Sequence, residues 1–157
     1  IYIMATVYSV QKTKWDQNVP SQKIDTTELA GRVRVAFAEY EAASLAINDV
    51  VEMFNLPNGA RIVSGRLAHD ALNSSTELSV GYAAHTNSAG STVALDADAY
   101  KAAGSSASAT AANVANTIAL GENSIVDANK DGLPVSITLT GAVASGTIQL
   151  TMFYVVD

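Results

Sequence analysis

The sequence of 157 residues contains no cysteine. That absence excludes a disulfide framework, a thiol nucleophile and a thiolate metal site, so packing or assembly must stabilise the fold. Basic residues are also few, because nine Lys and Arg stand against 15 Asp and Glu and leave a net charge of −6. Proteins that bind nucleic acid usually carry a positive charge that neutralises the phosphates, whereas this chain is negative. We therefore expect no nucleic-acid partner.

Long hydrophobic runs are missing as well. No stretch approaches the roughly 18 to 20 apolar residues of a membrane-spanning helix, and the first residues lack the basic and apolar regions of a signal peptide. We therefore expect no membrane partner and a soluble protein made in the cytoplasm. Hydrophobic residues nevertheless make up 48% of the chain, which is enough for the core of one domain.

Residues 1–30 show little hydrophobic periodicity, and they contain Lys12, Lys14 and the only tryptophan, Trp15. A disordered tail would have little reason to keep a tryptophan, so we predict an extended N-terminal arm that packs on something. Two surfaces remain open for Trp15: a partner protein, or the chain's own domain. Residues 31–157 form that domain.

Alternating apolar and polar residues predict a series of strands. In the first, one row is Val33, Val35 and Phe37 and the other is Arg32, Arg34 and Ala36, so that one row faces inward and one outward. Further strands are expected over residues 49–56, 60–72 and 76–82, and a shorter one near 117–120. Residues 135–140 and 147–154 predict a β-hairpin with an apolar face and a threonine-rich face.

The region 86–115 is rich in small and polar residues and is expected to be mostly loop. Its exception is a short helix over residues 96–103, because Asp96 can cap its first amides and Gly104 can end it in a left-handed conformation. Seven or eight strands with one short helix predict an all-β fold, a β-sandwich or jelly roll, preceded by the arm.

Catalytic signatures are sparse. The sequence has no phosphate-binding Gly-Lys-Ser/Thr loop, no Gly-x-Ser-x-Gly elbow and no His-Glu-x-x-His helix. Of the two histidines, His69 precedes Asp70, and neighbouring residues of a strand point to opposite faces. We expect no catalytic residues, and a hydrolase or lyase would need His69 or His85 beside a carboxylate in a cleft.

One segment matches part of a calcium loop. Asp127, Asn129 and Asp131 supply oxygen atoms at positions 1, 3 and 5, and Gly132 follows. Position 12 is Thr138 rather than glutamate, and a strand replaces the second helix, so the segment is no EF-hand. The favoured interpretation is a polar turn, with no cofactor bound; a calcium site would need a further carboxylate, and Glu122 is the nearest in sequence.

Several segments together resemble the decoration, or cement, proteins of phage capsids. They are residues 4–10 (MATVYSV), residues 49–62 (DVVEMFNLPNGARI), residues 67–71 (LAHDA) and residues 74–82 (SSTELSVGY). The resemblance implies a β-sandwich or jelly roll, often trimeric, that binds the outside of an icosahedral head and clamps neighbouring subunits. No catalytic residues come with it.

Under this hypothesis the chain is a virion structural protein on the capsid surface, made in the host cytoplasm. Its partners are the major capsid protein and two further copies in a homotrimer. The candidate capsid contacts are Lys12, Lys14, Trp15, Arg32 and Arg34. Two alternatives stay open: another phage head or tail component, and a calcium-dependent surface or carbohydrate-binding module that uses the loop from Asp127 to Asp131.

Overall fold

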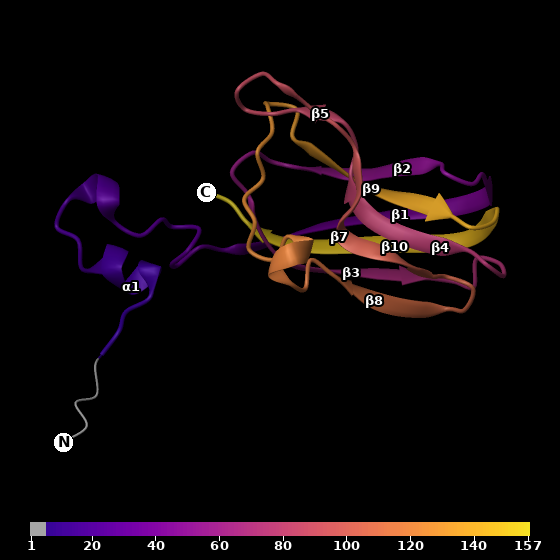
Figure 1. The fold of residues 1–157 in the computed structure, drawn as a ribbon, viewed down its shortest axis with the longest axis horizontal. Coiled ribbons are helices and arrows are strands. Elements are labelled where there is room, and N and C mark those ends of the chain that lie inside the picture. The colour runs from indigo at the N-terminus through magenta and orange to yellow at the C-terminus, as the bar shows by residue number, and fades with distance from the viewer. Residues whose placement is uncertain (1–5) are drawn as a thin grey trace.

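The alternating segments form eight strands that pack as two antiparallel four-stranded sheets (Figure 1). The structure, a computed structural model, describes residues 6–157. The first sheet contains, in order, β1 (Val33–Leu45), β10 (Ala144–Val155), β3 (Arg61–His69) and β8 (Thr110–Val114). The second contains β2 (Val50–Leu56), β9 (Leu133–Thr140), β4 (Glu77–Tyr82) and β7 (Asp96–Ser105). A separate hairpin joins β5 (His85–Thr86) to β6 (Thr92–Val93).

The strands pair in a nested order. β1 pairs with β10, β2 with β9, β3 with β8 and β4 with β7, so the chain resembles one long antiparallel ribbon folded at β4 and β7. Winding this ribbon around a core gives two sheets of four strands each, which is the jelly roll. The predicted all-β sandwich or jelly roll is confirmed.

The core lies between the two sheets. Leu67 and Leu150 of the first sheet and Ile137 of the second are at most 1% exposed. Leu150 and Ile137 come from strands in which every second residue is apolar, and burying such a side chain contributes about 1.5 to 3 kcal/mol. The inward rows therefore hold the sheets together.

The predicted hairpin of the last two strands is wrong in its pairing. Both segments are strands, but β9 pairs with β2 and β4, whereas β10 pairs with β1 and β3. Gly141 has a φ of 88° and turns the chain from one sheet to the other. The polar row of β9 is also not an exposed face, because Ser136 and Thr138 are buried.

The predicted helix over residues 96–103 is wrong as well. Residues 96–105 form strand β7, and β8 follows where a loop was expected. Pairing with β4 and burial of Tyr100, which is 6% exposed, outweigh the weak local helix signal. In addition, the strand expected near residues 117–120 is the 3-10 helix η2 (Ile118–Leu120).

The one α-helix among residues 6–157 lies in the arm. Helix α1 (Val10–Trp15) begins after Ser9, whose side chain accepts a hydrogen bond from the Lys12 amide, and η1 (Pro20–Gln22) follows. The arm is therefore not extended throughout, and Figure 1 shows it projecting beyond one end of the sandwich. Residues 4 and 5 of the resembling segment lie outside the described residues. No helix within residues 6–157 has the length and apolar character needed to cross a membrane.

Candidate interaction surfaces

The arm presents its tryptophan to solvent. Trp15 is 58% exposed and α1 buries no residue, so Trp15 is not folded back onto the sandwich. The two lysines of the helix are paired with acids of the arm, Lys12 with Asp16 at 2.6 Å and Lys14 with Glu28 at 3.0 Å. Helix α1 therefore presents an exposed apolar side chain to solvent, and its two positive charges are already paired with acids.

The base of the arm is fastened to the sandwich through Arg61 of β3. One guanidinium nitrogen lies 3.6 Å from a carboxylate oxygen of Glu28, and another donates a hydrogen bond to the Asn123 carbonyl oxygen at 3.0 Å. The hydrogen bond from Lys14 is the main reason why the pKa of Glu28 is lowered. Arg61 thus connects the arm to the loop that follows η2.

The other two candidate contact residues lie where the arm enters β1. Arg32 precedes the strand and Arg34 is its second residue, and both are exposed. Among the described residues neither forms an ion pair. The five sequence-predicted contacts therefore fall into two groups, one on α1 and one at the start of β1.

An exposed apolar row lies on the outer face of the first sheet. Val33, Val35 and Phe37 of β1 are 57–60% exposed, whereas Ala36 and Tyr40 of the alternate row pack against the core. The sequence showed the two rows but not which one faces inward. β1 is also an edge strand, so its second side has no partner strand among residues 6–157.

The same outer face becomes polar further along. Glu39 accepts a hydrogen bond from Gln149 and Glu41 accepts one from Thr147, both at 2.6 Å. Asp70, at the end of β3, accepts a hydrogen bond from the Thr147 amide at 3.2 Å. The face therefore runs from an apolar end near Val33 to an acidic end near Glu41.

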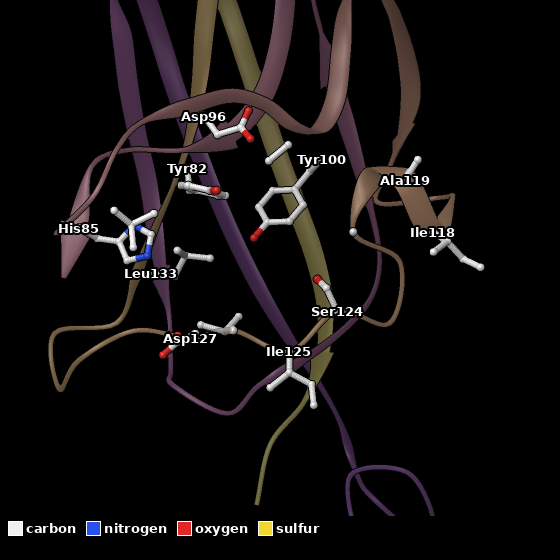
Figure 2. Close-up of a pocket in the computed structure, with 14 residues that line it drawn as sticks. Tyr82, His85, Asp96, Tyr100, Ile118, Ala119, Ser124, Ile125, Asp127 and Leu133 are labelled. Carbon is white, nitrogen blue, oxygen red and sulfur yellow. The ribbon is translucent and has the colours of Figure 1, made fainter. Parts of the chain in front are cut away.

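A cavity of about 460 Å³ opens at one end of the sandwich. Figure 2 shows Tyr82, His85, Tyr100 and Asp127 arranged around it, and they come from four separate segments of the chain. The Tyr82 and Tyr100 rings meet edge to face with centroids 6.1 Å apart. Burial raises the pKa of both tyrosines, so their hydroxyls keep their protons at neutral pH.

The polar groups of this cavity do not form a catalytic pair. Ser88 donates both its hydroxyl, at 2.5 Å, and its amide, at 2.9 Å, to Asp127, and these bonds lower the pKa of the carboxyl. His85 contacts the Ala83 carbonyl oxygen through Nδ1 at 3.1 Å. No serine hydroxyl within residues 6–157 is bonded to either histidine, and His69 contacts the backbone oxygen of Asp70.

The side chains of the candidate calcium loop are engaged within the chain. Asn129 accepts a hydrogen bond from the Asp131 amide at 2.9 Å, and Asp131 pairs with Lys130 at 2.8 Å. The Lys130 ammonium lowers the pKa of Asp131. In the described part of the chain no three His, Asp or Glu side chains are grouped to hold a metal ion, and Glu122 lines a different hollow from Asp127.

Comparison with known proteins gives a result for structure alone. No family model matches the sequence, and no curated protein matches it. A chain of the capsid of Ralstonia phage GP4 is similar with a TM-score of 0.63 and 20% identity, over 81% of this chain and 86% of that one. This chain shares its fold with chains of phage capsids.

Two further structures agree. A chain of the capsid asymmetric unit of cyanophage Pam1 has a TM-score of 0.60 and 21% identity, over 81% of this chain and 86% of that chain. A chain of the acid-stable capsid structure of Helicobacter pylori bacteriophage KHP30 has a TM-score of 0.52 and 17% identity, over 79% and 87%. At these identities the likeness shows a shared fold alone.

Proposed function

We propose that this chain is a non-enzymatic virion structural protein that binds the outer surface of a phage capsid and stabilises it. The observation that carries the proposal is the fold likeness to chains from three phage capsid structures, over about four fifths of this chain. The part left unmatched is similar in size to the N-terminal arm. The proposal places the protein on the virion surface after synthesis in the host cytoplasm.

The arm is the proposed contact with the major capsid protein. A six-residue helix is too short to be stable alone in water, and α1 buries no side chain in this chain. A partner surface that covers Trp15 would stabilise it. Lys12 and Lys14 would flank that contact, and Arg32 and Arg34 would extend it along the base of the arm.

The outer face of the first sheet is the proposed contact between copies, in a homotrimer. Val33, Val35 and Phe37 together expose an apolar row that water solvates poorly. The adjacent row of β10 supplies Thr147, Gln149 and Thr151, whose polar side chains would border this contact. Three arms on one trimer would bind the shell together, so a weak single contact becomes firm attachment.

A sedimentation experiment tests the proposed function. Capsids of the phage whose genome encodes this chain are prepared without it, mixed with the purified protein and pelleted. We expect saturable co-sedimentation and a higher temperature of capsid disruption. Absence of co-sedimentation would refute the proposal.

The alternatives predict other results. A calcium-dependent surface or carbohydrate-binding module would lose thermal stability when calcium is chelated, whereas we expect an unchanged unfolding temperature because Asp127, Asn129 and Asp131 have partners within the chain. Another head or tail component would bind a different part of the particle.

A further inference from the structure

The end cavity is lined by groups that accept hydrogen bonds and by no cation. Its acidic residues are Asp96 and Asp127, and neither Lys nor Arg is among its lining residues. Ser88 binds only one carboxylate oxygen of Asp127, so the other oxygen has no partner among residues 6–157. A guest that donates hydrogen bonds and carries a positive charge would therefore suit these acidic residues.

Tyr100 adds a hydroxyl that has no partner within the described chain. The residue is 94% buried, but its hydroxyl oxygen is open to the cavity and forms no hydrogen bond with any described residue. Figure 2 shows that this hydroxyl points into the space framed by Leu133, Ser124 and Ile125. A hydroxyl that faces an open cavity and has no partner within the described chain can form a hydrogen bond with a guest in place of water.

The Nε2 atom of His85 can also accept a hydrogen bond. A carbonyl oxygen only accepts, so the contact of Nδ1 with the Ala83 oxygen requires a proton on Nδ1. In the neutral ring, Nε2 is then an acceptor. The Tyr82 ring stands edge-on to the His85 ring, with centroids 5.2 Å apart, and these aromatic rings provide surfaces on which a flat cation can stack.

The rim of the cavity is apolar and exposed. Ile118 is 89% exposed and Ile125 is 56% exposed, and both line the cavity mouth. Such side chains fit a protein surface better than a free polar molecule. Ile125 is bridged to Arg61, the residue that fastens the arm, so the cavity and the base of the arm belong to the same end of the sandwich.

We propose that the end cavity receives an arginine side chain of a protein partner. The planar guanidinium carries five donors and stacks on aromatic rings, which matches the Asp127 carboxylate, the Tyr100 hydroxyl and the tyrosine rings. Ile118 and Ile125 pack on the apolar surface around the inserted side chain. That this partner is a capsid subunit rests on the proposed function; the chemistry of the cavity does not.

The test uses the full chain with two small probes, N-acetyl-arginine amide and its neutral analogue N-acetyl-citrulline amide, which has almost the same shape. Nuclear magnetic resonance follows the signals of Tyr82, His85 and Tyr100 during each titration. We expect saturable shifts with arginine, at a dissociation constant of about 1 to 10 mM for so small a ligand, and binding about tenfold weaker with citrulline.

Variants locate the site. Asp127→Asn removes a charge and Tyr100→Phe removes only the hydroxyl, and each is expected to weaken arginine binding by about tenfold. Asp98→Asn is the matched control, because Asp98 is an exposed acid outside the cavity lining, and it should leave binding unchanged. Signals far from the cavity verify that each variant is folded.

Three results would overturn the proposal: no saturable shift with arginine, equal binding of citrulline, or full binding by both Asp127→Asn and Tyr100→Phe. The assay contains no capsid. If the protein binds arginine but does not attach to capsids, the cavity proposal holds and the proposed function is refuted. If it attaches to capsids but does not bind arginine, the proposed function holds and the cavity proposal is refuted.

Discussion

Arg61 of β3 and Glu28 of the arm form an ion pair across 3.6 Å, with side chains only 17% and 13% exposed. This pair joins the base of the arm to the sandwich, and the Lys14–Glu28 pair at 3.0 Å joins α1 to the same base within the arm. Most other residues of the arm are exposed. The arm is thus fastened at its base and free at its tip, as a segment that reaches a partner needs to be.

The first prediction concerns this fastening. Trp15 is the only tryptophan and lies in the arm, so its fluorescence anisotropy reports arm motion. Glu28→Gln removes the charge that both Lys14 and Arg61 face, and we expect lower anisotropy at neutral pH with an unchanged unfolding temperature of the sandwich. Asp16→Asn, which breaks only the Lys12 pair within α1, is the control and should have a smaller effect.

The same pair sets a pH dependence. The pKa of Glu28 is lowered from its ordinary 4.5, chiefly by the hydrogen bond from Lys14. A lowered pKa in the folded state means that the contact stabilises the arm at higher pH and is lost as pH falls through that lowered value. The anisotropy of the unsubstituted protein should fall in acid to that of Glu28→Gln; a flat profile would contradict the account.

A second prediction concerns the approach of β7 to β4. A Cβ atom on Gly81 would overlap the Asp96 carbonyl oxygen and crowd the backbone of Ala97. Gly81→Ala should therefore lower the free energy of unfolding by about 1 to 3 kcal/mol. Gly104→Ala is the control within β7, because its Cβ would meet only the movable end of Lys101, and it should change stability by less than about 0.5 kcal/mol. Equal effects would argue against the strand pairing.

A third prediction compares two buried threonines. The Thr138 hydroxyl is buried without a hydrogen-bond partner, whereas the Thr76 hydroxyl donates to the Asn73 carbonyl oxygen and accepts from Ser106. Thr138→Val should be neutral or stabilise the fold by up to about 1 kcal/mol, since it removes an unsatisfied group. Thr76→Val should destabilise it by about 1 to 2 kcal/mol. Chemical denaturation measures both, and a reversed order would refute the assignment.

A fourth prediction tests the proposed contact between copies. Phe37→Glu places a charge in the apolar row of β1 and should convert the proposed homotrimer to a monomer without changing the unfolding temperature of the sandwich by much. Ile47→Glu is the control, because Ile47 is 47% exposed but lies in the turn after β1. Light scattering gives the molar mass. A Phe37→Glu variant that keeps the mass of the unsubstituted protein would exclude this face.

The sequence predicted the positions of strands better than the pairing between them. Alternation over residues 76–82 and the turn at Pro57-Asn58-Gly59 located β4 and the β2–β3 corner, because both signals are local. The pairing of β9 with β2 and β4 joins residues far apart in sequence, and alternation carries no information about which strand lies alongside. The last two strands consequently looked like a hairpin although they lie in different sheets.

Among the candidate sites, too, only features with a local sequence signal could be predicted. The arm could be predicted because an aromatic residue in an otherwise polar segment is a local signal, while contact of Trp15, Lys12 and Lys14 with a capsid stays a prediction. The outward direction of Phe37 could not be predicted, since alternation shows two rows of side chains but not which row faces the core. The cavity could not be predicted from the sequence, because Tyr82, Tyr100 and Asp127 lie far apart in the chain and come together only in the folded jelly roll. In addition, Tyr100 lies in a segment whose local pattern favoured a helix.

The most direct test of the central claim is electron cryomicroscopy of capsids that lack this chain, imaged after incubation with the full chain or with residues 31–157 alone. Our account predicts sandwich-shaped density on the outside of the shell with the full chain, the arm lying across neighbouring capsid subunits, and no such density with residues 31–157. Density inside the shell, density at a tail or portal only, or undiminished decoration by residues 31–157 would contradict it.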